Sequence, residues 1–116
     1  MHRIIAAALL SAVATAAHAA TITIDVPGAE ASDVVALTYD CGERQVEAVY
    51  HNADGVSLVV LTLGDETVVA ANVIAASGAR YAGAQYIWWT KGDSADLYDL
   101  MQGEDAPPVS CRASNP

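Results

Sequence analysis

The side chains best suited to chemistry gather in one stretch, ASGARYAGAQYIWWTKGDSA, which runs from Ala76 to Ala95. It holds the only lysine of the chain, Lys91, and both tryptophans, Trp88 and Trp89. It also contains Ser77, Gly78, Arg80, Tyr81 and Gly92. A hydroxyl and two cations are hydrogen-bond donors, and an exposed tryptophan suits a contact surface. The Ser77–Gly78 loop and the Lys91–Gly92 turn flank one predicted strand, and spacing alone does not show whether they converge.

Catalytic residues are scarce in this chain. No Gly-x-Ser-x-Gly elbow, His-Glu-x-x-His pair or phosphate loop is present. His51 stands next to a predicted turn, where a solvated histidine is more common than a general base. Asp93, Asp96 and Asp99 could suggest calcium, but a spacing of three on a strand sends neighbours to opposite faces. We therefore expect neither an enzyme, nor a metal site, nor a cofactor.

Trp88 and Trp89 are adjacent, so on a strand they point to opposite faces. One of them is expected in the core. The other is expected on the outer face or at a barrel mouth, where it can contact a partner. Lys91 stands directly before Gly92, at a turn from which its side chain can reach outward.

The sequence predicts that the elements that position these side chains are short strands joined by turns. Valine, threonine and tyrosine are frequent, and turn residues recur at regular spacing, which is typical of an all-β meander. Such a set closes into a small barrel or a sandwich, because closure removes exposed edges. A long loop is expected over 75–83 and a polar one over 102–108. The predicted strands are 21–26, 33–41, 45–51, 57–63, 67–74, 84–90, 95–100 and 109–112.

The first 19 residues are typical of an export signal. Arg3 begins a weakly basic region, Ile4 to Ala16 is almost wholly apolar, and Ala17-His18-Ala19 fits a small-x-small cleavage site. The alternative is a buried N-terminal helix. We expect a signal peptide over 1–19 and one domain over 20–116. No cysteine follows the apolar run, so no lipid can be attached there, and no membrane anchor is expected.

Charge narrows the choice of partners. The formal net charge is −9, and removal of Arg3 leaves 4 basic against 14 acidic residues, a net charge of −10 (4 − 14). Nucleic acids and anionic membranes require basic patches, so neither is an expected partner. The acidic surface serves solubility or a basic partner.

Cys41 and Cys111 are the two cysteines of the chain. An even pair in an exported protein predicts a disulfide. The bridge would close a loop of about 70 residues, worth about 4 kcal/mol in the chain-entropy model. Two free thiols or a metal pair are the alternatives, although a zinc site needs more ligands than the one histidine, His51, left after export.

Several segments, in order, resemble the bacterial periplasmic and membrane-bound inhibitors of c-type lysozyme. The resemblance covers roughly residues 34–112 and rests chiefly on two motifs, Ser-Gly-Ala-Arg-Tyr at 77–81 and Trp-Thr-Lys-Gly-Asp at 89–93. The chain departs from the family at Ala75 and Ser94, where a serine and a glutamate are frequent. The remaining matches are Tyr39-Asp40-Cys41, Val46, Tyr50, Asn52, Ala95, Leu97 and Cys111.

The resemblance implies an eight-stranded antiparallel barrel with one disulfide, and two loops that enter the active-site cleft of a lysozyme. It implies that Ser77 and Lys91 contact the two catalytic carboxylates. The surrounding partner-binding residues would be Gly78, Arg80, Tyr81, Trp89 and Gly92. Arg80 either contacts the enzyme or pairs with an aspartate beside the loop. The missing lipid cysteine indicates the soluble, periplasmic branch of the family, which protects peptidoglycan from host lysozyme.

Two other functions stay open from the residues alone. The first is a secreted β-barrel that carries a small ligand, supported by the aromatic strand, although an eight-stranded barrel has little room beyond its own side chains. The second is a structural or adhesin-like module of the cell envelope.

Overall fold

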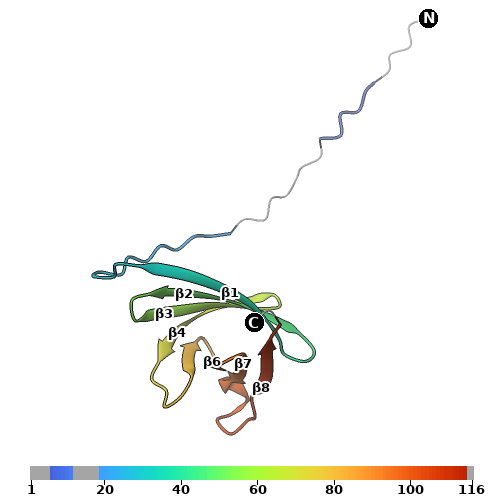
Figure 1. Ribbon diagram of the computed structural model, residues 1–116. Coiled ribbons are helices and arrows are strands. Elements are labelled where there is room, and N and C mark those ends of the chain that lie inside the picture. Colours follow the sequence, from blue (N-terminus) through green and yellow to red (C-terminus); the bar gives the residue numbers. More distant parts are fainter. Residues whose placement is uncertain (1–5, 12–18, 115–116) are drawn as a thin grey trace, which may run out of the picture.

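The computed structural model describes residues 6–11 and 19–114. Each strand pairs antiparallel with the next, and the last returns to the first, so the sheet closes into a barrel (Figure 1). This confirms the predicted all-β barrel of about eight strands. The strands are β1 (Ser32–Asp40), β2 (Gln45–Ala53), β3 (Val56–Leu63), β4 (Glu66–Val73), β5 (Ala79–Gly83), β6 (Tyr86–Lys91), β7 (Ser94–Asp99) and β8 (Val109–Ala113), with a 3₁₀ helix η1 (Leu100–Gln102) between the last two.

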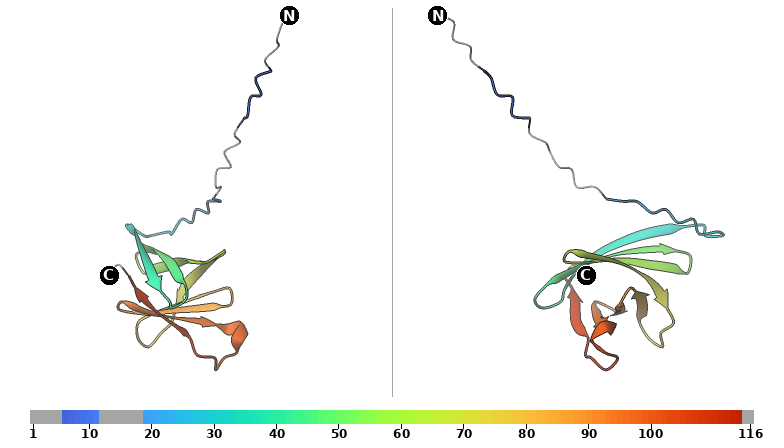
Figure 2. Two further views of the ribbon diagram at one scale, coloured as in Figure 1. Left: turned by 90° about the vertical axis from the view of Figure 1, so that its right-hand side faces the viewer. Right: turned by 180° about the vertical axis from the view of Figure 1, so that it is seen from behind.

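Alternation of apolar and polar residues decides which face of each strand is inside. Along β2, Val46, Ala48 and Tyr50 are buried and the residues between them are more exposed. The longer strands β1–β4 form a curved sheet, and β5–β8 close it from the other side (Figure 2). The core therefore lies between these two halves.

Three aromatic residues from different strands meet at the centre of this core. The Trp88 Nε1 donates a hydrogen bond to the Tyr50 hydroxyl at 2.9 Å, and the hydroxyls of Tyr50 and Tyr39 are also 2.9 Å apart. The Trp88 and Tyr39 rings pack edge to face, with centroids 4.9 Å apart. Burial raises the pKa of Tyr50 and of Tyr39 above the usual tyrosine value, because an ionised phenolate would lose its hydration there.

The predicted disulfide is confirmed. Cys41, directly after β1, is bonded to Cys111 in β8, and the two residues are 70 positions apart in the sequence. This joins the first and last strands, whose pairing is otherwise short: Tyr39 faces Ala113 and Asp40 faces Arg112.

Two strand predictions are wrong. Residues 21–26 form no strand, and Ile22 and Ile24 are 83% and 63% exposed. A strand forms only where a neighbour pairs with it, and within residues 6–11 and 19–114 the partners of β1 are β2 and β8. Residues 21–26 have the alternating pattern of a strand, but the segment has no pairing partner in the barrel.

The second error is the long loop expected over 75–83, of which Ala79–Gly83 is β5. Small residues are required here because the backbones approach closely. A Cβ on Gly83 would lie 2.3 Å from the Val69 carbonyl oxygen and 2.8 Å from the Ala70 Cα. Glycine in a strand often marks such an approach, so these residues indicated a tightly packed strand rather than a loop.

The expected signal peptide falls mainly on residues 1–5 and 12–18, which lie outside the described part of the chain. Residues 6–11 are described and form no regular structure. Within the described ranges 6–11 and 19–114, no helix has the length and apolar character needed to cross a membrane.

Candidate functional site

The position of β5 brings the two sequence motifs to the same end of the barrel. Because β5 pairs with β6, the loop before β5 and the turn after β6 lie together, although they flank the predicted aromatic strand at opposite ends in sequence. In register, Ala79 faces Thr90 and Arg80 faces Trp89. The two motifs are therefore neighbours in space, which could not be read from their spacing without β5.

Gly78 makes the contact between the two loops. A Cβ at this position would lie 2.2 Å from the Thr90 carbonyl oxygen and 2.8 Å from the Lys91 Cγ. Its φ is also +67°, a backbone conformation that L side chains rarely adopt. Only glycine therefore lets the Ser77 loop lie directly against the base of the Lys91 side chain.

Trp89 fastens the same two loops from the outer face of β6. Its Nε1 donates a hydrogen bond to the Ser77 carbonyl oxygen at 2.8 Å. The Arg80 guanidinium carbon and the Lys91 Nζ each lie 5.6 Å from its ring centroid, within the range of a cation–π interaction. The partner of Arg80 in the structure is thus this ring, whereas an aspartate was the scaffold partner expected from the sequence.

Exposure divides the predicted contact residues into three groups. Ser77, Gly78, Lys91 and Gly92 are exposed, and Trp89 and Arg80 are half-buried. Tyr81 differs, since it is only 5% exposed and its hydroxyl lies 2.9 Å from the Ser57 Oγ. It therefore supports the loop from beneath, where its ring is shielded from any partner.

A shallow hollow of about 190 Å³ adjoins the turn on the outer face of β6 and β7. Trp89 and Lys91 line it from β6, and Ser94, Asp96 and Tyr98 line it from β7. Trp89 faces Asp96 across the strand pair, and Lys91 faces Ser94. The site thus places one carboxylate near its cationic and aromatic side chains.

Ile74 is a surface residue that the sequence analysis missed. It follows β4, at the start of the loop that carries Ser77, and 94% of its surface is exposed. The signal was present, since the apolar pattern of the predicted strand 67–74 ended with this isoleucine next to the loop. A single exposed aliphatic residue is normal on a protein surface, so the exposure of Ile74 alone does not mark a contact.

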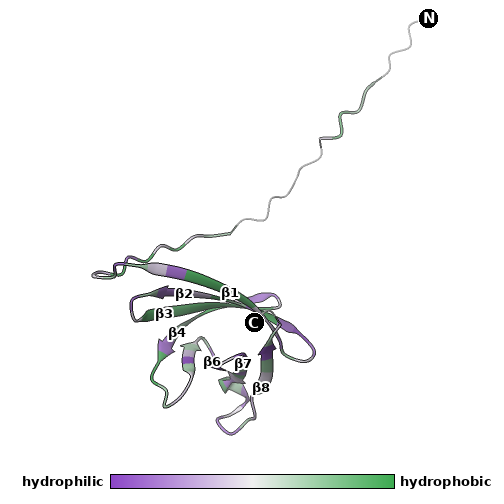
Figure 3. Ribbon diagram, in the orientation of Figure 1, coloured by the Kyte–Doolittle hydropathy of each residue, from purple (hydrophilic) through white to green (hydrophobic). Residues whose placement is uncertain are grey.

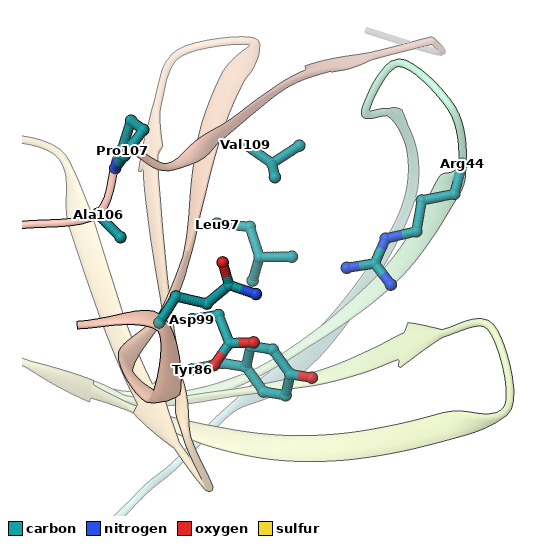
Figure 4. Close-up of a pocket in the computed structure, with 8 residues that line it drawn as sticks. Arg44, Tyr86, Leu97, Asp99, Ala106, Pro107 and Val109 are labelled. Carbon is teal, nitrogen blue, oxygen red and sulfur yellow. The ribbon is translucent and has the colours of Figure 1, made fainter.

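A second hollow, of about 140 Å³, lies at the far end of β7 (Figure 4). Arg44 points toward it from the β1–β2 turn, opposite Leu97, Tyr86 and Asp99. The Tyr86 hydroxyl donates to Glu66 at 2.8 Å, and this hydrogen bond to a carboxylate is the main reason that the pKa of Tyr86 is raised. Asp99 accepts hydrogen bonds from Gln85 and from the Met101 amide, each at 3.0 Å. The Tyr86 hydroxyl and the Asp99 carboxylate are thus already engaged within the protein.

The other residues considered for chemistry lie apart. His51 is exposed on β2, which contains the whole of the strand predicted over 45–51. Asp93, Asp96 and Asp99 occupy the β6–β7 turn, the outer hollow and the far end of β7. In the described part of the chain, no three His, Cys, Asp or Glu side chains gather as ligands of a metal ion would.

The family model of membrane-bound lysozyme inhibitors of c-type lysozyme matches residues 39–106, more than half of the chain. The match includes both loop motifs. The chain belongs to this family.

Individual relatives agree with that assignment. A protein of Cupriavidus necator named membrane-bound lysozyme inhibitor of C-type lysozyme is 41% identical over 101 residues, which cover 84% of this chain and 80% of the relative. A protein of the same name from Pseudomonas aeruginosa is 44% identical over 89 residues, which cover 74% of this chain and 70% of the relative.

A solved structure agrees as well. The crystal structure of Pseudomonas aeruginosa MliC in complex with hen egg white lysozyme superposes on this chain with a TM-score of 0.70. Its sequence is 37% identical, and the alignment covers 84% of this chain and 99% of that one. At this level of identity the shared barrel is accompanied by a shared family.

Proposed function

We propose that this protein inhibits c-type lysozyme by inserting the Ser77 loop and the Lys91 turn into the active-site cleft of the enzyme. The observation that carries the proposal is the junction at Gly78, which holds both loops together at one end of the barrel. The family assignment and the lysozyme complex of the Pseudomonas aeruginosa relative support the same partner.

The chemistry of the two exposed side chains fits the chemistry of the target. A retaining glycosidase of this kind carries a protonated glutamic acid and an ionised aspartate close together. The Lys91 ammonium can pair with the aspartate, and the Ser77 hydroxyl can hydrogen-bond the glutamic acid in either protonation state. Occupation of both carboxylates would block the substrate and remove the groups that perform catalysis.

The remaining residues of the site have supporting roles in this proposal. Trp89 orients Lys91 and the Ser77 carbonyl, Arg80 lies against the same ring, and Gly92 forms the turn. Tyr81 holds the loop base through Ser57. Preorganised loops lose less conformational freedom on binding, which favours affinity.

The charge of the chain supports a basic partner. Lysozymes of this type are typically basic, and the inhibitor has a formal net charge of −9. Complementary charge accelerates encounter and disfavours wrong partners. The site itself is the exception, because the single lysine of an acidic protein stands where a carboxylate is to be bound.

We further propose that the protein is exported and acts in the periplasm without an anchor, although its relatives are named membrane-bound. Both cysteines are joined in the Cys41–Cys111 disulfide, so neither is free to carry a lipid. Mass spectrometry of the periplasmic fraction should find an N-terminus within a few residues of Ala20. Full-length protein recovered from membranes would contradict this.

A small-ligand carrier has less support than an inhibitor. Trp88, Tyr39, Leu61, Val46 and Val59 are the largest fully buried side chains, and they fill the interior of the barrel. The two hollows described above lie toward the outside and are small.

A turbidity assay tests the proposal. Purified protein is mixed with c-type lysozyme and a suspension of bacterial cell walls, and clearing of the suspension is followed over time. We expect saturable inhibition at a one-to-one ratio of chains to enzyme. The protein reduced and unfolded beforehand is the control, and unchanged clearing by the folded protein would overturn the proposal.

A further inference from the structure

The first part of β1 has only one neighbouring strand. It pairs with β2 along its whole length, from Ser32 to Asp40, whereas it pairs with β8 only at Tyr39 and Asp40. The next residue after β8, Ser114, donates its amide to the Thr38 carbonyl at 2.8 Å. From Ser32 to Leu37 the second edge of β1 therefore has no strand beside it among the described residues. Figures 1 and 2 show this part of β1 extending away from β8.

The pairing already present shows which backbone groups face that edge. In a strand, the amide and carbonyl groups of alternate residues point to the same neighbour. Thr38 and Asp40 bond toward the β8 side, so Val34 and Ala36 also direct their N–H and C=O groups there. These two residues thus present four backbone groups that have no strand partner in the described part of the chain, the arrangement that accepts another strand.

The side chains along this edge are apolar and uncharged after Asp33. Val34 is 62% exposed and Val35 is 41% exposed. Figure 3 shows β1 as apolar beyond its polar beginning. Native proteins usually protect a free edge with lysine, proline, a bulge or inward charges. Between Val34 and Leu37 none of these residue types is present, so this edge is suited to pairing.

The edge is also complementary to itself. If two copies align antiparallel about a two-fold axis at Val35, Val34 of one copy faces Ala36 of the other, and Asp33 faces Leu37. The two Val34–Ala36 pairs are then hydrogen-bonded pairs, with four backbone bonds in total. No like charges stand directly opposite each other, which would be destabilising. A two-fold contact of one patch with itself is the usual geometry of a homodimer.

We propose that two copies of this protein associate through the free edge of β1, from Asp33 to Leu37, as a continuous antiparallel sheet. On the next two strands, the outward-facing residues in register with Ala36 are the uncharged Val49 and Val60. The pairing of five residues buries far less than the roughly 800 Å² per partner of a stable interface. The dimer is therefore reversible and depends on concentration.

The net charge of the protein predicts how dimerisation depends on salt. Each processed copy carries a formal net charge of −10 (4 basic and 14 acidic residues), so the two copies repel each other until salt screens them. The Debye length falls from about 30 Å at 0.01 M to about 8 Å at 0.15 M ionic strength. Dimerisation should therefore strengthen with salt, in contrast to an association driven by opposite charges.

Sedimentation and hydrogen exchange of the processed chain test the proposal together. We expect the mass to double with increasing concentration at 0.15 M salt, and the amides of Val34 and Ala36 to become protected over the same range. If these amides are protected at every concentration while the chain stays monomeric, the segment 21–26 covers the edge instead and the proposal is overturned. Fast exchange of both amides at every concentration also overturns it.

Matched substitutions locate the contact. Val34→Lys places a charge at the free edge and should abolish the doubling of mass. Val69→Lys introduces the same charge on the outer face of β4, where the valine is 54% exposed, and should leave the doubling intact. Equal behaviour of the two variants would contradict the edge as the interface. Lys91→Glu, which disrupts the proposed inhibition, should dimerise as the parent does, so the two proposals can fail separately.

Discussion

The two faces of β6 carry the same type of side chain in opposite surroundings. On the inner face, Trp88 is fully buried and its indole N–H is bonded to Tyr50. On the outer face, the adjacent Trp89 is half-buried, with Arg80 and Lys91 against its ring and its N–H bonded to the Ser77 carbonyl. One tryptophan holds the two halves of the barrel together, and the other holds the two loops of the site.

The difference between Trp88 and Trp89 shows that residue type alone does not reveal whether a side chain serves stability or function. A strand sends neighbouring side chains to opposite faces, so the two indoles share a backbone but none of their contacts. Substitutions on the inner face should act first on the free energy of unfolding. Substitutions on the outer face should act first on inhibition.

The largest expected effect is that of Trp88→Ala. Loss of a buried tryptophan typically costs about 3–5 kcal/mol in the free energy of unfolding, and here it also removes a partner of Tyr50. Trp89→Ala should cost about 1 kcal/mol or less, because its cation–π contacts are half exposed. Urea unfolding of both variants measures this. Equal losses of stability would contradict the division between the two faces.

Gly78→Ala should damage both properties. The new Cβ meets the Thr90 carbonyl at 2.2 Å in a backbone of positive φ, and overpacking of this kind costs about 1–3 kcal/mol. The loops must separate, so inhibition should weaken as well. Gly42→Ala is the matched control, since Gly42 also has a positive φ but nothing within 4 Å. It should lower stability alone. A Gly78→Ala variant with full inhibition would show that the junction is not needed.

Ser77→Ala should affect inhibition without affecting the fold, because the side chain is exposed. A hydrogen bond to a neutral group contributes about 0.5–1.5 kcal/mol and one to a charged group about 1.5–3 kcal/mol. The inhibition constant should therefore increase by a factor between a few-fold and about a hundredfold. Titration of lysozyme with the parent and the variant gives this ratio. A ratio of one would remove the Ser77 hydroxyl from the contact.

The pH dependence of stability tests the inner face. Burial raises the pKa of Tyr50 and Tyr39 above their ordinary value of 10.0, so above about pH 10 the unfolded chain loses these protons first. The free energy of unfolding should then fall by up to about 1.4 kcal/mol per pH unit for each tyrosine, until the pH reaches the pKa of that tyrosine in the folded protein. Urea unfolding between pH 9 and 11.5 measures the slope. A constant free energy of unfolding over this range would contradict the buried hydrogen-bond chain.

Sequence patterns were sufficient to predict those features that depend on residues close together in the chain, such as the alternation of side chains along a strand. The strands around Val46 and Leu61, the disulfide and the opposite faces of Trp88 and Trp89 were all predicted. The strand at 21–26 was predicted wrongly because its pattern is that of a strand, while pairing depends on a neighbour that the pattern does not reveal. β5 was missed because Gly83 reads as a loop residue, although its smallness serves close packing.

The sequence proposes residues for the site but does not reveal how they are arranged in space. Ser77 and Lys91 were identified through short motifs, yet their proximity depends on the register of β5 with β6. For Tyr81 the motif suggested contact with a partner, whereas the structure buries this side chain beneath the loop. Exposure of Ile74 likewise follows from where β4 ends, which sequence reasoning places only to within a few residues.

The central claim is that Lys91 pairs with the catalytic aspartate of the enzyme, and a double-mutant cycle tests it most directly. Binding is measured for Lys91 and Lys91→Ala against c-type lysozyme and against the same enzyme with that aspartate replaced by asparagine. Loss of one partner of a desolvated charge pair costs about 2–5 kcal/mol, and close charge pairs show coupling of about 1.5–7 kcal/mol. We therefore expect Lys91→Ala to bind the parent enzyme at least thirtyfold more weakly, about 2 kcal/mol, and to bind the asparagine variant nearly as well as the unsubstituted inhibitor does. Effects of the two substitutions that simply add, with no coupling, would contradict the proposed mechanism.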